Sequence, residues 1–281
     1  MRPTGAALTA GVIGQPIAHS LSPLMMSAWI ESAGINAIYT PYIATPHMFA
    51  PVVSALFRAG LKGLNVTLPH KTDALMIANR ISDAADKIGA ANLLTSVDGE
   101  IHADNTDAYG FISSLRKAGV EPAGRSVLVL GAGGASRAVT YGLLDAGASD
   151  VAIANRSLGK AREIARDLAP NSEILSWDDR SRLLGEVDIV VNATSLGLKG
   201  QIPLEMDWSQ AGEDLVAVDT VYTPLETRFL ADARARGLLG IDGLGMLIEQ
   251  GKPSFQAFFG CAAPEQADIR SLLVQALESH E

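Results

Sequence analysis

The chain has few of the residues from which cross-links and metal sites are built. Its 281 residues include one cysteine, Cys261, which excludes an intramolecular disulfide and any metal site made of several cysteines. The five histidines form neither an HExxH motif nor a paired spacing. We therefore expect no metal ion.

Positive charge is also scarce. The chain has 22 Lys and Arg against 31 Asp and Glu, a net charge of −9. Nucleic-acid-binding proteins usually carry a basic face, so we expect no nucleic-acid partner. Membrane-spanning helices need a run of about 18 apolar residues, and no such run is present. The N-terminus lacks a convincing signal peptide, so we expect a cytoplasmic protein that has no membrane partner.

Hydrophobic residues make up 48% of the chain, enough for a sizeable core. Strand and helix patterns alternate in two series, which predicts an α/β fold of two domains with parallel sheets covered by helices on both faces. We expect domains at residues 1–107 and 120–240, with Gly119–Gly124 as a linker, and closing helices over 241–281. Asp98-Gly99 is the expected turn of a hairpin.

A glycine-rich segment, "VLVLGAGGASRA", lies between a strand pattern and a helix pattern. Gly131, Gly133 and Gly134 follow the strand, and Ser136 takes the position of the third glycine of GxGxxG. Glycines allow the backbone to approach a pyrophosphate that rests on a helix N-terminus, so the segment predicts a dinucleotide site. The alternative is a tight turn that binds nothing.

The next strand pattern indicates which dinucleotide is bound. An NAD site usually has Asp or Glu about 20 residues after the glycines, but here the strand ends in Asn155-Arg156-Ser157, with Lys160 close by. Arg and Lys suit the 2′-phosphate of NADP. The alternative is two solvated cations at a helix start. We favour NADP.

Polar residues also follow several strand patterns, where doubly wound sheets bind their ligands. Each has an ordinary alternative as a turn or cap residue. They are Asn65 and Thr67; Asn192, Thr194 and Ser195; and Asp219 and Tyr222.

Motifs along nearly the whole chain are similar to those of the shikimate dehydrogenase family, in the same order and spacing. That resemblance implies an NADP-dependent oxidoreductase that reduces 3-dehydroshikimate to shikimate in aromatic amino acid biosynthesis. The sequence leaves open whether the protein is a monomer or a homodimer. It also implies an N-terminal substrate domain, a Rossmann-type NADP domain, and C-terminal helices that return to the first domain. The motifs are "IGQPIAHSLSP", "NVTLPHK", "AAN", "DNTDAYGF", "GAGGASRA", "ANRS", "NATSLG", "DTVYTP" and "DGLGMLIEQG".

The resemblance assigns roles to residues that match its motifs. Lys71 and Asp107 would be the catalytic pair. Ser20 and Ser22 would hold the substrate carboxylate. The ring hydroxyls would be bound by Asn65, Thr67, Lys71, Asn92, Asp107 and Gln250, with Tyr222 nearby. The cofactor would contact Gly131, Ala132, Gly133, Gly134, Ala135, Asn155, Arg156, Ser157, Lys160, Thr194, Ser195, Val221 and Gly243.

Several of these residues have structural alternatives. Ser22 before a proline could be a helix N-cap, Asp107 could simply stabilise a helix start, and Gln250 could lie on a helix surface. Lys71 is more informative, because we expect a helix to begin near it, where a cation is unfavourable. A residue that manages a proton or a developing negative charge would explain that position.

Two rival functions stay open. One is a family member that also uses quinate, or NAD. The other is a non-catalytic protein of this fold that senses a ligand. The two serines of "SLSP", Arg156 and Lys160 are arguments against the first, and the joint presence of Lys71, Asp107 and the glycine loop is an argument against the second.

Overall fold

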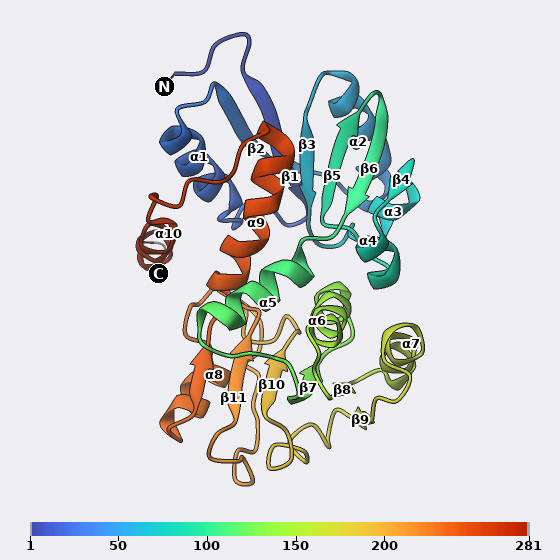
Figure 1. The fold of residues 1–281 in the computed structure, drawn as a ribbon, viewed down its shortest axis with the longest axis vertical. Coiled ribbons are helices and arrows are strands. Elements are labelled where there is room, and N and C mark those ends of the chain that lie inside the picture. Colours follow the sequence, from blue (N-terminus) through green and yellow to red (C-terminus); the bar gives the residue numbers. More distant parts are fainter. Residues whose placement is uncertain (1, 280–281) are drawn as a thin grey trace. The chain divides into compact units, whose positions relative to one another are not determined.

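A computed structural model describes residues 2–279, which divide into two compact units (Figure 1). The N-terminal unit contains the described residues up to Thr106 together with those from Leu247 onward. The C-terminal helices thus return to the first unit, as expected. The second unit contains Asp107–Met246. Among the described residues, no helix has both the length and the apolar run that crossing a membrane would require.

The N-terminal unit is built on a six-stranded sheet with the order β2-β1-β3-β5-β6-β4. Its strands are β1 (Leu8–Gly14), β2 (Ala37–Ile43), β3 (Gly63–Val66), β4 (Arg80–Ile81), β5 (Leu93–Val97) and β6 (Glu100–Asp104). Its helices are α1 (Ser22–Ala33), the short 3-10 helix η1 (Pro46–Met48), α2 (Phe49–Arg58), α3 (Asp73–Met76), α4 (Asp83–Ile88), most of α9 (Leu244–Phe259), and α10 (Ile269–Glu278).

This first sheet is mixed rather than wholly parallel, which corrects our expectation. Strands β1, β2 and β3 are parallel, but β5 runs antiparallel to both β3 and β6. The reason is the hairpin at Asp98-Gly99, whose positive φ angles of 51° and 83° suit a two-residue turn. Such a turn can join only antiparallel strands.

Helices cover both faces of the first sheet. Alternate residues of a strand point to opposite faces, and β3 shows the two sides clearly. Leu64 belongs to the core formed with α2, α3 and α4. A Cβ at the neighbouring Gly63 would lie 2.3 Å from the ring of Phe258, so α9 packs directly on the other face. On that side α9 also approaches α1, because a Cβ at Gly251 would lie 2.4 Å from Met25.

The second unit has a wholly parallel six-stranded sheet with the order β12-β11-β10-β7-β8-β9. Strand order reverses between β7 and β10, the arrangement of a dinucleotide-binding fold. Its strands are β7 (Ser126–Leu130), β8 (Asp150–Asn155), β9 (Ile174–Ser176), β10 (Ile189–Asn192), β11 (Val216–Asp219) and β12 (Leu239–Ile241). Its helices are α5 (Asp107–Lys117), α6 (Gly134–Asp145), α7 (Leu158–Leu168) and α8 (Arg228–Ala235).

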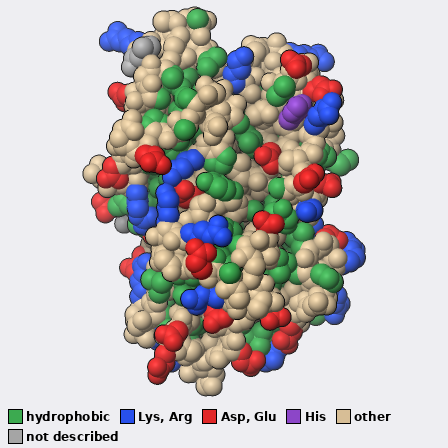
Figure 2. Space-filling model, viewed as in Figure 1, with side chains coloured by type: hydrophobic (Ala, Val, Ile, Leu, Met, Phe, Trp, Pro, Cys, Tyr) green, Lys and Arg blue, Asp and Glu red, His purple; other side chains and the backbone are tan. Residues whose placement is uncertain are grey.

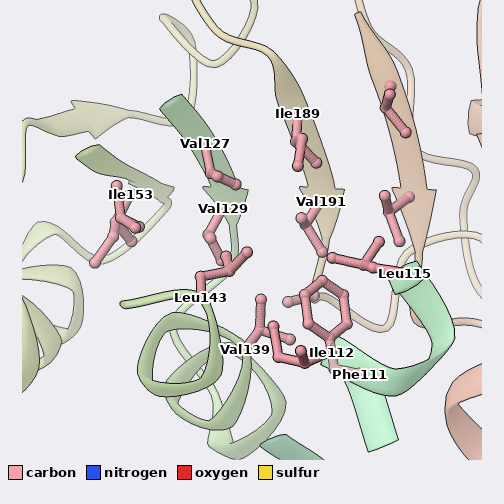
Figure 3. Close-up of a cluster of buried hydrophobic side chains, with 14 of the residues drawn as sticks. Phe111, Ile112, Leu115, Val127, Val129, Val139, Leu143, Ile153, Ile189 and Val191 are labelled. Atoms are coloured by element: carbon pink, nitrogen blue, oxygen red, sulfur yellow. The ribbon is translucent and has the colours of Figure 1, made fainter. Parts of the chain in front are cut away.

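The core of the second unit lies on both faces of this sheet. Val127 and Val129 face α5, α6 and α7, whereas Leu128 and Leu130 face α8 and the segment before β11. Figure 3 shows the first of these faces, with Phe111 and other side chains of α5 and α6 against β7 and β10. The expected linker, Gly119–Gly124, joins α5 to β7 within this unit. The three-residue edge strands β9 and β12 were missed because they are too short to show an alternating pattern.

Candidate active site

In the N-terminal unit, the loops that follow β1 and β3 meet at one edge of the sheet. The two strands are parallel, so both loops leave from the same edge. The backbone N–H of Gln15 donates to the carbonyl of Leu68 at 2.9 Å. A Cβ at Gly14 would lie 2.4 Å from the side chain of Thr67, so only glycine permits this approach. The half-buried Thr67 therefore lies beside the loop that leads to the two predicted serines.

Helix α1 begins at Ser22, which is not its N-cap. The preceding residue, Leu21, is already helical with φ −82° and ψ −8°, and no side chain caps the helix. Instead the backbone N–H of Ser22 donates to Oγ of Ser20 at 3.3 Å. Ser22 is buried and Ser20 is half-buried. The structure therefore removes the simple capping explanation for Ser22, and it leaves two hydroxyls at a helix N-terminus that would favour an anion.

Asn65 is buried at the end of β3, and its amide is bonded on both sides. Its Oδ1 accepts from the hydroxyl of Tyr39 at 2.8 Å. Its Nδ2 donates to Oγ of Ser254 at 2.8 Å and to the carbonyl of Asn92 at 3.3 Å. Two predicted residues, Asn65 and Asn92, therefore lie together. Tyr39 and Ser254 were not singled out by the sequence.

Nδ2 of Asn92 donates to Oε1 of Gln250 at 3.4 Å, and both residues also bond to Thr106, which the sequence analysis missed. The backbone N–H of Thr106 donates to Oδ1 of Asn92 at 2.7 Å, and Nδ2 of Asn92 donates to the Thr106 hydroxyl at 3.0 Å. That hydroxyl lies 3.4 Å from Oε1 of Gln250. Gln250 is buried, so it is not part of an exposed helix surface. The position of Thr106 beside Asp107 in "DNTD" was the available signal.

Helix α3 begins at Asp73, two residues after Lys71, so a helix does begin near Lys71, as expected. Helix α3 has only four residues, because the segment after it forms strand β4, which pairs with β6. The half-buried Lys71 lies in the turn before α3, and its carbonyl accepts from the N–H of Ala91 at 2.8 Å. The neighbouring His70 is fully buried and bonds the carbonyl of Ala44 at 2.8 Å. A helix of one turn has only a small dipole, and the backbone of Lys71 is firmly held.

Asp107 is buried and is the first residue of α5, as expected. Its neighbour Thr106 is fixed by the hydrogen bonds to Asn92 described above. The backbone that enters α5 is therefore restrained immediately before the predicted catalytic carboxylate.

In the second unit, the glycine-rich loop joins β7 to α6. Gly131 has φ +111°, and a Cβ there would lie 2.9 Å from the carbonyl of Ala193, so a side chain is excluded. A Cβ at Gly133 would meet nothing within 4 Å. The hydroxyl of the buried Ser136 donates to the carbonyl of Gly131 at 2.7 Å, which explains a serine at the third glycine position. No side chain caps α6. This open, uncapped helix start fits a pyrophosphate.

The residues that follow β8 are exposed and include two cations. Nδ2 of Asn155 donates to the carbonyl of Ser157 at 2.9 Å and so shapes the turn into α7. Within the described part of the chain, Arg156 and Lys160 have no ion-pair partner, and both are exposed. These groups fit a 2′-phosphate, and no acidic side chain stands in the place that an NAD ribose would need.

The ends of β10 and β11 are held by a buried polar network. Asp219 accepts from Nδ2 of Asn192 at 2.9 Å, from the N–H of Val221 at 2.9 Å and from the hydroxyl of Thr227 at 2.7 Å. Burial, with a smaller contribution from the charge of nearby Asp242, nevertheless raises the pKa of Asp219 to about 6. The network fixes the loops in which several predicted cofactor residues lie.

Those loops contain the remaining predicted cofactor residues. The hydroxyl of Thr194 is used locally, since it donates to Oδ1 of Asn192 at 2.7 Å and accepts from Leu196 N–H at 3.0 Å. Ser195 is exposed.

Gly243 lies against the loop that follows β11. Its N–H donates to the carbonyl of Val221 at 3.2 Å, and a Cβ there would lie 2.4 Å from the carbonyl of Thr220.

Burial raises the pKa of Tyr222 to about 12, so this phenol keeps its proton at neutral pH.

Charges on the molecular surface are mixed in sign. Figure 2 shows Lys and Arg side chains interspersed with Asp and Glu over the face in view. Because the net charge is −9, we expect an anionic ligand to be attracted by local groups such as Arg156 or a helix N-terminus, rather than by a broad positive field.

Comparison with known protein families gives three consecutive matches. Residues 12–94 match the shikimate dehydrogenase substrate binding domain, residues 115–199 match the shikimate / quinate 5-dehydrogenase model, and residues 243–273 match the shikimate 5'-dehydrogenase C-terminal domain. Among curated proteins, the NADP(+) shikimate dehydrogenase of Maricaulis maris is 50% identical over 277 residues, which is 99% of each chain. That of Caulobacter vibrioides is 40% identical over 98% of this chain and 97% of its own.

Solved structures show the same likeness. The shikimate dehydrogenase of Aquifex aeolicus superposes with a TM-score of 0.89 at 35% identity, over 96% of this chain and 99% of that one. The Thermus thermophilus enzyme in complex with NADP(H) and shikimate has a TM-score of 0.85 at 34% identity, over 98% of this chain and 100% of that one. A 5-ketofructose reductase of Gluconobacter has a TM-score of 0.86 at 31% identity, over 99% of this chain and 100% of that one. From its sequence, its fold and these likenesses, the chain belongs to the shikimate dehydrogenase family.

Proposed function

We propose that this protein is an NADP-dependent shikimate dehydrogenase, which reversibly reduces 3-dehydroshikimate to shikimate in the shikimate pathway. The observation that carries the proposal is the 50% identity to an NADP(+) shikimate dehydrogenase over 99% of the chain. Two local features support it. The N-terminal unit gathers neutral polar side chains suited to a polyol, and the second unit has an uncapped helix start and, after β8, two exposed cations, Arg156 and Lys160.

In this proposal, the two units have different ligands. The N-terminal unit binds the substrate, with Ser20 and Ser22 at the start of α1 holding its carboxylate. Of the residues assigned to the ring hydroxyls, this unit contains Asn65, Thr67, Lys71, Asn92 and Gln250. Asp107 and Tyr222 belong to the second unit and stay proposed substrate residues. We keep residues 1–107, 120–240 and 241–281 as the proposed functional divisions of the chain.

The second unit would hold NADP. The loop Gly131–Ala135 and the N-terminus of α6 face the pyrophosphate, and the turn Asn155–Ser157 with Lys160 binds the adenosine ribose and its 2′-phosphate. The rest of the cofactor would lie beside the loops that contain Thr194, Ser195, Val221 and Gly243. Thr194 would act through its backbone or methyl group, since its hydroxyl is used within its own loop.

Bound NADPH supplies a hydride to the carbonyl carbon of the substrate. The task of the protein is to hold that carbonyl and to manage the charge and proton on its oxygen. Lys71 provides a cation for the oxygen as it gains negative charge. Asp107, the other residue of the proposed catalytic pair, would share in the transfer of the proton. The Lys71 backbone is held by the N–H of Ala91, and the backbone just before Asp107 is held by the bond from Thr106 to Asn92. These restraints reduce the reorganisation required when the reaction begins.

One set of assays tests the function. Purified protein should reduce NADP with shikimate, and should act more slowly with quinate or with NAD. These alternatives need measurement, because the matched family model includes quinate dehydrogenases and a Listeria relative of 28% identity was solved with shikimate and NAD. A chain that binds shikimate but does not turn it over would support the sensor alternative.

Cofactor choice is tested at Arg156. Arg156→Asp removes a charge-assisted contact worth about 1.5–3 kcal/mol, so kcat/KM with NADP should fall by at least tenfold and that with NAD should change little. Arg162→Asp, an equal charge change at an exposed position of α7, is the control. Equal efficiency of the wild type with NAD and NADP would contradict the assignment. A cytoplasmic location and a monomeric or homodimeric state stay predictions, the latter open to light scattering.

A further inference from the structure

Three buried side chains from distant segments, those of Tyr39, Asn65 and Ser254, lie together, with Asn65 between the other two. Tyr39 lies on β2, Asn65 on β3 and Ser254 on α9, and all three belong to the N-terminal unit. Their exposed fractions are 4%, 7% and 0%. In a site this dry, each polar atom needs a partner, and the pattern of partners fixes which way an amide points.

The orientation of the Asn65 amide follows from its neighbours. The carbonyl of Asn92 can only accept, so the Asn65 atom that lies 3.3 Å from it must be Nδ2. The same Nδ2 donates to Oγ of Ser254, whose own proton goes to the carbonyl of Gln250 at 3.3 Å. Oδ1 therefore faces Tyr39, and the phenol donates to it at 2.8 Å. Burial raises the pKa of Tyr39 well above its usual value, so the phenol keeps the proton that it donates.

This arrangement limits what Asn65 can offer to a ligand. Both hydrogens of Nδ2 are used, one on the Asn92 carbonyl and one on Ser254. Oδ1 has accepted one hydrogen bond and retains a second lone pair. The side chain of Asn65 can thus accept one further hydrogen bond and can donate none.

We propose that Tyr39 and Ser254 are positioning residues, which lock the amide of Asn65 so that it presents only an acceptor to the substrate. The chemical group selected at this point is a hydroxyl, which can donate, and a keto or ether oxygen is rejected. This inference rests on the proposed function, because it takes Asn65 to contact a hydroxyl of shikimate. It extends that function by naming the polarity of the contact and the two residues that enforce it.

The test compares variants in steady-state kinetics. Tyr39→Phe keeps the ring, which lies 6.2 Å from that of Phe258, and removes only the hydroxyl. Ser254→Ala removes the acceptor on the opposite side. Each should raise the KM for shikimate by about tenfold, because a buried hydrogen-bonded group is left without its partner. The KM for NADP should stay within about twofold, and kcat should fall by less than about threefold, as expected when uniform binding is lost. Tyr42→Phe is the matched control on β2, because no hydrogen bond of its hydroxyl is found in the described structure.

A double-mutant cycle shows whether Tyr39 acts through Asn65. In an Asn65→Ala background, Tyr39→Phe should change the shikimate KM by less than about twofold, because the group that it positions has gone. Residues that merely stabilise the fold would give additive effects, or would lower Tm while leaving KM unchanged.

The outcomes separate this inference from the function on which it rests. A wild type that oxidises shikimate, with variants whose shikimate KM is unaltered, would overturn the positioning roles and leave the function intact. Additive KM effects in the cycle would do the same. A wild type that does not oxidise shikimate would overturn the proposed function and, with it, the inference. If Tyr39→Phe folds poorly, Ser254→Ala carries the same test from the other side of the amide.

Discussion

Asp219 should make the protein less stable as the pH rises. Its carboxylate is buried at the end of β11, with an exposed fraction of 1%. Burial raises its pKa from 3.8 to about 6, although Thr227, Val221 and Asn192 all donate to it. At a pH between the unfolded pKa of 3.8 and the folded pKa of about 6, Asp219 keeps its proton in the folded protein but has lost it in the unfolded chain. The free energy of unfolding therefore falls as the pH rises through this range, and the loss is complete above the folded pKa.

The size of the effect follows from the shift. A shift of one pKa unit corresponds to about 1.4 kcal/mol, so the change from 3.8 to about 6 amounts to about 3 kcal/mol at neutral pH. About 1 kcal/mol of this is already lost at pH 4.5, which leaves about 2 kcal/mol between pH 4.5 and pH 7.5. Asp219→Asn is nearly isosteric, removes the charge and keeps an oxygen for Asn192 and Val221.

The assay is urea unfolding of both proteins at pH 4.5, 6.0 and 7.5. Relative to the wild type, Asp219→Asn should gain about 2 kcal/mol of stability between the lowest and the highest pH, whatever its absolute stability. Asp207→Asn is the control, because the pKa of exposed Asp207 is lowered by the N–H of Ser209 and its dependence on pH has the opposite sign. A stability difference between Asp219→Asn and wild type that does not vary with pH would refute the reasoning.

Three further predictions concern the proposed site. Lys71→Met should lower kcat by about 10²–10⁴ with little change in Tm, because the hydrogen bond from Ala91 N–H to the Lys71 carbonyl is retained. Lys62→Met, at an exposed position, is the control, and a Lys71→Met protein with a lowered Tm but normal turnover would show that Lys71 is structural. Gly131→Ala should raise the Kd for NADP by at least tenfold and reduce stability, because φ is +111° and the new Cβ would lie 2.9 Å from a carbonyl. Calorimetric titration with NADP would measure the Kd, and an unchanged Kd would argue against a tight loop. Ser136→Ala should cost about 1–3 kcal/mol in urea unfolding by leaving the Gly131 carbonyl without its partner, and an unaltered midpoint would show that water replaces the hydroxyl.

Local signals were sufficient for the class of fold. Alternating strand and helix patterns predicted two α/β domains, and both sheets with their helices confirm the prediction. The hairpin at Asp98-Gly99 was recognised because a turn depends on a few adjacent residues. What that hairpin does to the sheet was missed: it makes β5 antiparallel and the first sheet mixed. Strand partners are chosen at long range, which no local pattern reports.

Packing decided the features in which the sequence misled. The segment after Met76 has helix-forming residues, yet Arg80 and Ile81 pair with β6, so α3 ends after one turn. Propensity is a weak preference that a sheet edge overrides. Ser22 precedes a proline, as an N-cap would, but the helical conformation of Leu21 moves the start of α1.

The sequence by itself determined the chemistry that the chain can display: the glycines of the dinucleotide loop, the cations Arg156 and Lys160, and the family motifs that include Lys71 and Asp107. These signals lie within short segments, where residue type and spacing suffice. Only the tertiary structure decided how side chains are aimed. Ser254 reaches Asn65 across 189 positions of sequence, and Tyr39 meets the same amide from another strand. Hydrogen bonds between distant segments depend on how helices and strands pack, and packing follows from burial of the whole core rather than from any local run of residues.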